Sequence, residues 1–349
     1  MDENKLNSLV GQVLQDLGGA YSVPLVQIGE HLGLYEALND AGPCTVNEIA
    51  QSAGVDERYM REWLNAQAAS NYISYDADTE KFWMTPEQAF LLADRDSPFY
   101  LAPAFGAAAT FQQNEPQVRE AFKTGAGIPW GEQTPCLSCA VARFFRPGYQ
   151  NNLVRLWLPA ISGMVEKLEQ GSRVADVGCG HGITTAIMAQ AFPNSEFVGF
   201  DFHQPSIDAA RTHAAAHSLS NISFEVSLAK ELPGHYDLVT IFDCLHDMGD
   251  PIGAMKHVRE LLDENGACMI VEPMAGDRLA DNLNPVSRLY YCASTMVCVP
   301  TSLAQEHGAA LGAQAGEKRL REVIVDGAGF SHLNRVAETP FSIVLEARP

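Results

Sequence analysis

Three alternating glycines after an apolar run give the clearest chemical signal in this chain. The segment Val174-Ala-Asp-Val-Gly-Cys-Gly-His-Gly182 places Asp176 just before Gly178, Gly180 and Gly182. Glycines at this spacing let the backbone leave a strand, turn sharply and approach a ligand where any side chain would collide. The pattern is typical of a nucleotide-binding turn, and by itself it is also compatible with a structural loop.

A second acidic residue stands where the next strand is expected to end. Asp201 closes the apolar run Phe197-Val-Gly-Phe-Asp201, and its distance from the glycines fits one strand-helix-strand unit. A carboxylate at that strand tip can accept hydrogen bonds from both hydroxyls of a ribose. The turn and this acid together predict a nucleoside-containing ligand.

A histidine follows the next long apolar run. Residues 236–243 read as a buried strand that continues into Asp243-Cys-Leu-His-Asp247. An imidazole titrates near neutral pH and can take a proton from a hydroxyl group as that group reacts. His246 therefore places a titratable side chain at this strand end, and a structural histidine is the alternative to a chemical role.

The elements that must position these residues alternate along the C-terminal half of the chain. Turn residues separate apolar strand-like runs from helical segments throughout this half. Such alternation predicts an α/β fold with a doubly wound, mostly parallel sheet. The predicted elements are a helix at 184–191, strands at 222–226 and 236–243, a helix ending at 262, and a strand at 267–272.

The motifs taken together resemble those of class I S-adenosylmethionine-dependent methyltransferases, in the small-molecule O-methyltransferase-like branch with an N-terminal winged-helix domain. The resemblance covers nearly the whole chain, because residues 327–330, 335–338 and 341–347 look like the closing helix, strand and strand of that family. It implies a Rossmann-like sheet whose last strand is inserted antiparallel. It also implies S-adenosylmethionine as the cofactor and a small molecule as the methyl acceptor.

The resemblance implies a set of cofactor-binding positions. In the family the glycine turn holds the methionine end, the acid after the second strand binds ribose, and the segment 243–247 faces the transferred methyl group. One departure is Leu228, where such enzymes often place an acid for the adenine amino group, so that the backbone N–H of Ala229 would serve instead. The implied cofactor contacts are Tyr149, Asp176, Gly178, Cys179, Gly180, Gly182, Asp201, Phe202, Leu228, Ala229 and Asp243.

The resemblance also implies a catalytic group. His246 lies in a Leu-His-Asp sequence like that of the catalytic histidine of plant O-methyltransferases, where two acids orient the ring. Glu272 in Val-Glu-Pro-Met matches the first acid, and Glu317 matches the second only approximately because its neighbours are transposed. A metal-dependent variant with His246 and Asp247 as ligands is an alternative, but no second histidine follows Val-Glu-Pro. We therefore expect no metal.

The N-terminal third reads as a helix-turn-helix followed by a wing. Thr45-Val-Asn-Glu48 is a capping box, Asp56 caps the next helix, and residues 71–75 and 81–84 supply two short strands. A transcriptional regulator, or a ligand sensor with a silent methyltransferase-like domain, is the alternative reading. Residues 1–100 hold five Lys or Arg against sixteen Asp or Glu, and the whole chain carries a net charge of −20. This charge disfavours nucleic acid and anionic membranes as partners.

The domain boundaries follow from these patterns. We expect a winged-helix and dimerisation domain at 1–91, a helical insert rich in aromatic residues at 92–150, and the cofactor domain at 151–349. In relatives of the family the first module makes a dimer, which implies a homodimer here. Apolar residues at helical spacing in its first helix also predict a packing face. They are Leu6, Leu9, Val10, Val13 and Leu17.

Composition predicts a cytoplasmic enzyme. The chain has 349 residues, 46% of them hydrophobic, without an apolar run of membrane-spanning length or the basic and apolar start of a signal peptide. Its eight cysteines are scattered and read as reduced thiols. Only Cys136-Leu-Ser-Cys139 has the spacing of a redox or zinc pair, which is a weak signal without a second pair.

Overall fold

The computed structural model describes residues 1–135 and 137–349. The predicted pair Cys136–Cys139 therefore falls partly outside the described residues. The chain forms two compact units, residues 1–110 with 143–147 and residues 111–142 with 148–349. The segment 92–150, which the sequence suggested as one insert, contributes to both units.

The first unit contains the winged-helix module that the sequence predicted. Thr45 and Glu48 form a complete capping box at the start of α3, and the Asp56 carboxylate accepts from the first backbone N–H groups of α4. The short strands β1 and β2 pair antiparallel as the wing. The elements are α1 (Glu3–His31), α2 (Leu34–Ala41), α3 (Val46–Ala53), α4 (Glu57–Ala69), β1 (Ser74–Asp76), β2 (Lys81–Trp83) and α5 (Pro86–Leu92).

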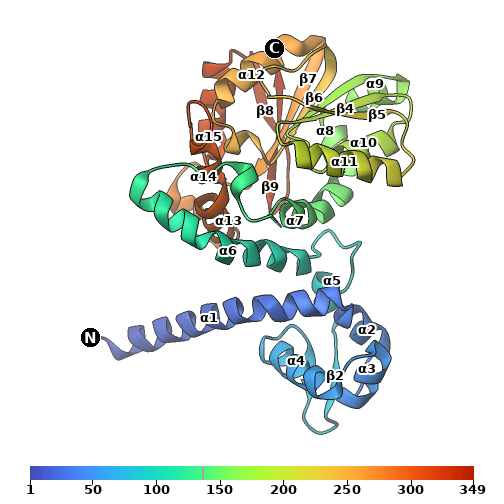
Figure 1. The fold of residues 1–349 in the computed structure, drawn as a ribbon, viewed down its shortest axis with the longest axis vertical. Coiled ribbons are helices and arrows are strands. Elements are labelled where there is room, and N and C mark those ends of the chain that lie inside the picture. The colour runs from blue at the N-terminus through green and yellow to red at the C-terminus, as the bar shows by residue number, and fades with distance from the viewer. Residues whose placement is uncertain (136) are drawn as a thin grey trace. The chain divides into compact units, whose positions relative to one another are not determined.

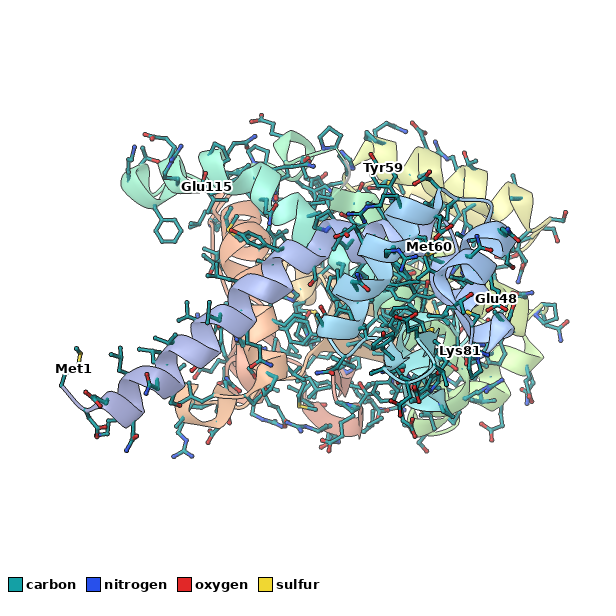
Figure 2. All side chains as sticks on the ribbon, turned by 90° about the horizontal axis from the view of Figure 1, so that it is seen from below. Met1, Glu48, Tyr59, Met60, Lys81 and Glu115 are labelled. Carbon is teal, nitrogen blue, oxygen red and sulfur yellow. The ribbon has the colours of Figure 1, made fainter. Side chains whose placement is uncertain are left out.

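Aromatic residues hold the core of this unit. The rings of Tyr35 and Trp63 meet edge to face with centroids 5.1 Å apart, and the Tyr35 hydroxyl donates to Gln67 Oε1 at 2.7 Å. Buried residues recur every three to four positions along α4, as expected for an amphipathic helix. Figure 2 labels two neighbours on it, of which Met60 is buried and Tyr59 is exposed to solvent.

Several helices connect the wing to the large sheet. They are α6 (Ala102–Thr124), the 3₁₀ turn η1 (Trp130–Glu132), α7 (Leu137–Asn152), the π-helical turn η2 (Leu153–Trp157), α8 (Leu158–Ala160) and α9 (Met164–Gln170). The dense aromatics of this segment extend into the second unit as a buried group. There the ring of Tyr149 contacts the rings of Trp157 and Phe242, with centroids 6.1 and 5.5 Å away.

The second unit is built on a seven-stranded sheet in the order β5-β4-β3-β6-β7-β9-β8. Strands β3 to β7 pair in parallel, and β9 runs antiparallel between β7 and β8. The predicted Rossmann-like sheet with an inserted antiparallel last strand is therefore confirmed. Its strands are β3 (Arg173–Val177), β4 (Glu196–Asp201), β5 (Ile222–Val226), β6 (Tyr236–Phe242), β7 (Leu262–Pro273), β8 (His332–Glu338) and β9 (Ser342–Arg348).

Helices cover both faces of this sheet. In Figure 1, α9, α10 and α11 lie on one side, and α12 and α15 lie on the other. Because both faces are covered, the central strands are buried along most of their length and read as continuous apolar runs. The remaining elements are α10 (Ile183–Ala191), α11 (Gln204–Ala216), η3 (Leu245–Asp247), α12 (Pro251–Leu261), η4 (Leu279–Asn282), α13 (Pro285–Ala293), η5 (Ser294–Cys298), α14 (Val299–Leu303), α15 (Gly316–Arg321) and η6 (Glu322–Gly327).

This arrangement places the carboxyl ends of β3, β4, β6 and β7 along one edge of the sheet. The glycine turn follows β3, Asp201 ends β4, Asp243 follows β6, and Glu272 lies near the end of β7. Ligands of open α/β sheets bind beyond these strand ends. Among the described residues, no helix is long and apolar enough to cross a membrane.

Candidate active site

The glycine turn is a compact backbone structure. All three glycines have a positive φ, of 71° at Gly178, 51° at Gly180 and 69° at Gly182. The N–H of Gly178 donates to the carbonyl of Phe200 at 2.8 Å, and the N–H of Gly180 donates to Asp201 Oδ2 at 2.9 Å. The turn is therefore fastened directly to the end of β4.

The three glycines serve different purposes. A Cβ on Gly178 would lie 2.3 Å from Cys244 Sγ, and one on Gly182 would lie 2.6 Å from the Phe224 ring. A Cβ on Gly180 would meet no atom within 4 Å. Gly178 and Gly182 are thus required by packing within the protein, whereas Gly180 borders open space.

Asp176 is an internal anchor. Its Oδ2 accepts from the hydroxyls of Thr184 at 2.7 Å and Thr185 at 2.6 Å, and its Oδ1 accepts from Thr240 at 3.0 Å. Burial raises the pKa of this carboxyl, and the three hydroxyl bonds oppose that rise. The carboxylate that the sequence suggested for the cofactor therefore ties β3 to α10 and β6.

Both carboxylate oxygens of Asp201 accept hydrogen bonds from backbone N–H groups near the glycine turn. Besides Gly180, it accepts from the backbone N–H of His203, at 2.8 Å through Oδ1. Burial raises its pKa, while these two N–H bonds lower it. Each carboxylate oxygen can accept a further hydrogen bond. Asp201 can therefore still bind a ligand hydroxyl.

Two exposed apolar side chains lie on the loops that leave β4 and β5. Phe202 follows Asp201, and the loop of Leu228 is joined to Asp201 because the Ser227 N–H donates to the Asp201 carbonyl at 3.1 Å. Phe202 is 47% exposed and Leu228 is 44% exposed, whereas Cys179 in the turn is buried. Ala229 packs against the sheet core. The structure thus gathers the residues expected around adenosine near one strand edge.

Asp243 has an unusual conformation and an unused oxygen. Its φ is +48°, in the left-handed region that few residues other than glycine adopt. Aspartate is one of the side chains that tolerate this region best. The Tyr149 hydroxyl donates to Asp243 Oδ2 at 2.6 Å, but the buried Oδ1 has no hydrogen-bond partner. Burial raises the pKa of Asp243 to about 7, against the lowering effect of the Tyr149 bond. An orphaned acceptor of this kind fits a cationic or hydrogen-bonding ligand group.

His246 is buried on the 3₁₀ turn η3 and held by Glu272. Its Nδ1 lies 2.5 Å from Glu272 Oε2, and the N–H of Leu245 donates to the other Glu272 oxygen at 3.0 Å. A carboxylate at one ring nitrogen fixes the ring orientation and directs the other nitrogen outward. The two residues that the sequence paired are thus brought together.

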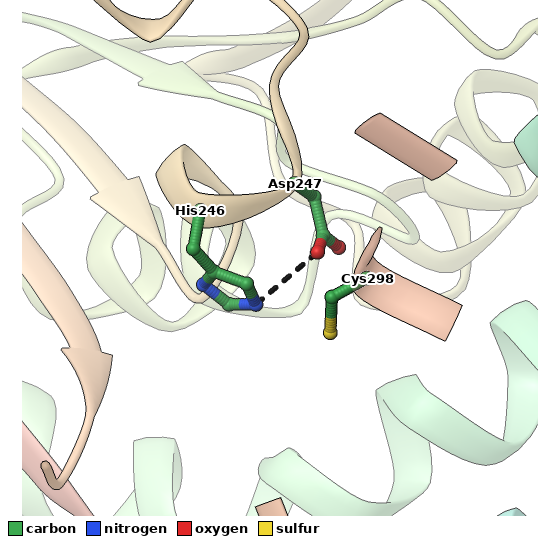
Figure 3. A group of neighbouring side chains, drawn as sticks. All are labelled: His246, Asp247 and Cys298. Atoms are coloured by element: carbon green, nitrogen blue, oxygen red, sulfur yellow. Dashed lines mark ion pairs between the residues drawn. The ribbon is translucent and has the colours of Figure 1, made fainter. Parts of the chain in front are cut away.

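Asp247 and Cys298 lie at the other ring nitrogen of His246. Figure 3 shows both side chains beside Nε2, which is 3.2 Å from Asp247 Oδ1. Burial by itself lowers the pKa of His246, but the charges of Glu272 and Asp247 outweigh burial and raise the pKa well above its ordinary value. Burial also raises the pKa of Asp247.

Glu317 does not have the place that the sequence suggested for it. Its Oε2 pairs with Arg335 at 2.9 Å, and its Oε1 lies 3.8 Å from Arg321. The carboxylate is thus committed to two arginines rather than to the ring of His246. The second acid at His246 is Asp247, which comes from the same turn.

Sequence reasoning missed Cys298 and Gln305 at this site. The Gln305 amide donates to the carbonyl of Asp247 at 2.9 Å and accepts from the Gly249 N–H at 3.0 Å, so it fixes the turn that carries His246. Both residues come from a segment with no recognisable motif. Their proximity to η3 follows only from the packing of η5 and α14.

Comparison with known proteins agrees with this architecture. Residues 168–324 match the family model described as a methyltransferase domain, and residues 20–94 match the Rv2258c-like winged HTH domain. The chain thus contains a winged-helix domain followed by a methyltransferase domain.

Curated relatives match over part of the chain. The ubiquinone biosynthesis O-methyltransferase of Acinetobacter baylyi is 32% identical over 127 residues, which is 35% of this chain and 51% of that protein. The protein of the same description from Bordetella avium is 33% identical over 129 residues, or 35% of this chain and 50% of the relative. The chain spans about half the length of these relatives.

Solved structures match over nearly the whole chain and share its fold. A Nostoc punctiforme protein predicted to be an O-methyltransferase has a TM-score of 0.72 at 19% identity, with 97% of this chain and 98% of that chain covered. Mitomycin 7-O-methyltransferase has a TM-score of 0.66 at 18% identity and full coverage of both chains. Human N-acetylserotonin methyltransferase, solved with S-adenosylmethionine, has a TM-score of 0.67 at 16% identity, with 97% of each chain covered.

Proposed function

We propose that this protein, in which residues 168–324 match a methyltransferase domain, transfers the methyl group of S-adenosylmethionine to an oxygen of a small, partly aromatic molecule. The observation that carries the proposal is the buried pair of His246 and Glu272, held at 2.5 Å beside a preformed glycine turn. The relatives named above support both the cofactor and the oxygen acceptor.

The residues present fit the cofactor. The open space next to Gly180 admits a ligand close to the backbone, and Asp201 retains lone pairs for ribose hydroxyls. The exposed apolar side chains of Phe202 and Leu228 provide two surfaces for the adenine ring. The orphaned Oδ1 of Asp243 suits the positive ammonium group at the methionine end. Tyr149 then acts by fixing the Asp243 carboxylate.

Methyl transfer from a sulfonium requires chiefly an acceptor atom in line with the methyl group. As the new O–C bond forms and the C–S bond breaks, an acceptor hydroxyl must lose its proton. His246 Nε2 takes that proton, and the carboxylates of Glu272 and Asp247 stabilise the resulting imidazolium. The same charges favour a protonated ring at rest, so Nε2 must release that proton to solvent before it can act as the base.

Titration calorimetry with S-adenosylmethionine and S-adenosylhomocysteine tests the cofactor assignment. We expect micromolar binding of both, and a weakening of at least tenfold in Asp201→Ala, which corresponds to about 1.4 kcal/mol. A panel of small phenols and hydroxy acids, followed by mass detection of methylated product, then tests the acceptor class. Absence of binding to either ligand would contradict the proposal.

We also infer a homodimer formed through α1. The stripe Leu9, Val13 and Leu17 is about half exposed on this helix, and such a face is stabilised by burial against a matching surface. Light scattering should give twice the 37.9 kDa chain mass. The variant Leu9→Glu should shift the protein toward monomer.

The winged-helix module presents little unpaired positive charge on α4 for a nucleic acid. Both arginines of α4 are engaged by glutamates of the same helix, Arg58 with Glu62 at 2.5 Å and Arg61 with Glu57 at 3.0 Å. DNA phosphates require free positive charge on the helix that faces them. This pairing supports an enzyme over a DNA-binding regulator.

A further inference from the structure

Three potential metal ligands converge at the outer side of the His246 ring. His246 Nε2, a carboxylate oxygen of Asp247 and Cys298 Sγ all lie within 4.8 Å of one another. Figure 3 shows the three side chains close together, with His246 and Asp247 from η3 and Cys298 from η5. Imidazole, thiolate and carboxylate together form a donor set typical of zinc sites.

The spacing of two of these atoms suits a shared ion. Nε2 and Asp247 Oδ1 lie 3.2 Å apart as an ion pair, without the geometry of a hydrogen bond at Oδ1. A tetrahedral zinc ion with N and O ligands at about 2.0 to 2.1 Å separates those atoms by about 3.3 Å. In the absence of a metal the two atoms form an ion pair, and their separation also matches that of two neighbouring ligands of one ion.

The opposite side of the ring supports the same assignment. Metal-bound histidines almost always donate their second ring N–H to a carboxylate or carbonyl group. Here Nδ1 is 2.5 Å from Glu272 Oε2, and the Leu245 N–H fixes the other oxygen of that carboxylate. Glu272 thus already provides the support that a metal-bound His246 requires.

We propose that His246, Asp247 and Cys298 bind a zinc-like divalent ion, with the fourth position open to water. On binding, Cys298 loses its thiol proton to solvent and Nε2 carries the metal in place of a proton, while no atom changes its oxidation state. The ion occupies the lone pair that the proposed base uses. Bound zinc therefore inhibits methyl transfer, a consequence that rests on the proposed function, whereas the metal site rests on the geometry alone.

Cobalt(II) is the probe for the site, because a thiolate bound to cobalt gives a near-ultraviolet charge-transfer band and tetrahedral cobalt gives visible bands. Titration of the full-length, chelator-treated protein should develop both bands to one equivalent, and zinc should abolish them. The variant Cys298→Ser should lose the charge-transfer band. The matched control Cys292→Ser, which removes an exposed free cysteine nearby in the chain, should keep it.

A second variant tests the site even if Cys298→Ser fails to fold. Glu272→Gln leaves all three ligands in place but weakens their support, so the cobalt bands should persist with an affinity about 10- to 100-fold lower. Absence of the band in the unaltered protein, or its persistence in Cys298→Ser, would overturn the site.

The inhibitory role has a separate readout. One equivalent of zinc should abolish methyl transfer, and a chelator should restore it. The cobalt spectra need no methyl acceptor, so they test the metal site independently of the enzymatic activity. Full activity of the zinc-loaded protein would overturn the inhibition but leave the site standing. Cobalt binding with no methyl transfer under any condition would count against the proposed function instead.

Discussion

Two pairs of carboxylates at the same edge of the sheet differ in how they are satisfied. Every oxygen of Asp176 and Asp201 accepts from a hydroxyl or backbone N–H of the protein. Asp243 and Asp247 each leave one buried oxygen without a hydrogen-bond partner. Both residues of the first pair complete the fold around the glycine turn, and Asp201 can accept a further bond from a ligand hydroxyl. The second pair retains buried acceptors that the protein itself leaves without a hydrogen bond.

This contrast separates structural residues from binding residues within one motif. A buried acceptor that is fully bonded contributes mainly to stability, because its removal leaves several donors unsatisfied. A buried acceptor without a partner is costly unless a ligand completes it. Changes at Asp176 should therefore affect folding first, changes at Asp201 should affect both folding and ribose binding, and changes in the second pair should affect ligand binding first.

The largest stability effect is expected for Asp176→Ala. The change leaves the hydroxyls of Thr184, Thr185 and Thr240 without their shared acceptor, at a cost of about 3 kcal/mol or more. Urea unfolding of the cofactor-free protein measures this cost. A loss below about 1 kcal/mol would show that Asp176 is not the anchor described above.

Gly180→Val should remove about 100-fold or more of the cofactor affinity, equivalent to about 3 kcal/mol. The side chain would fill the open space beside the turn and would also be strained at a φ of +51°. Calorimetry with S-adenosylhomocysteine measures the loss. Gly125→Val is the matched control, because that residue also has a positive φ and open space but follows α6 rather than β3.

Asp243 should make cofactor affinity depend on pH. Its carboxyl, with a pKa of about 7, attracts an ammonium group only when deprotonated. Affinity should therefore be highest above pH 7 and should fall about tenfold from pH 8 to pH 6. Calorimetry across this range checks the slope, which Asp243→Asn should flatten. An unchanged slope in that variant would assign the titration to another group.

The smallest effect is expected for Glu317→Ala. Its two partners are arginines on the partly exposed side of α15 and β8, and such pairs contribute about 0.2 to 1 kcal/mol. The methylation rate should change by less than about twofold, since the carboxylate does not reach His246. A rate loss comparable to that of a His246 variant would restore the role that the sequence suggested.

The sequence predicted the turn well because its determinants are local. The glycines, Asp201 and the strand pattern lie within one strand-helix-strand unit, and each carries its own conformational or burial signal. His246 and Glu272 were found through family resemblance, and their contact follows from the parallel pairing of β6 with β7.

The remaining site residues could not be predicted in this way. Cys298 reaches His246 because the π-helical turn η5 packs near η3, and no residue spacing encodes that contact. The sequence assigned Glu317 to the His246 site through a motif whose neighbouring residues are transposed. In the structure Glu317 lies on α15, and its carboxylate pairs with Arg335. Asp176 has the expected location, but its carboxylate stabilises the fold because it accepts from three hydroxyls of α10 and β6. Those contacts cannot be read from the sequence motif.

The central claim is that His246 is the base of a methyl transfer, and single-turnover transfer of labelled methyl from S-adenosylmethionine to an accepted phenol tests it most directly. His246→Ala should lower the rate about 100- to 10,000-fold with cofactor affinity unchanged. His217→Ala, at an exposed histidine on the far end of α11, should not alter it. An unchanged rate in His246→Ala would contradict the claim.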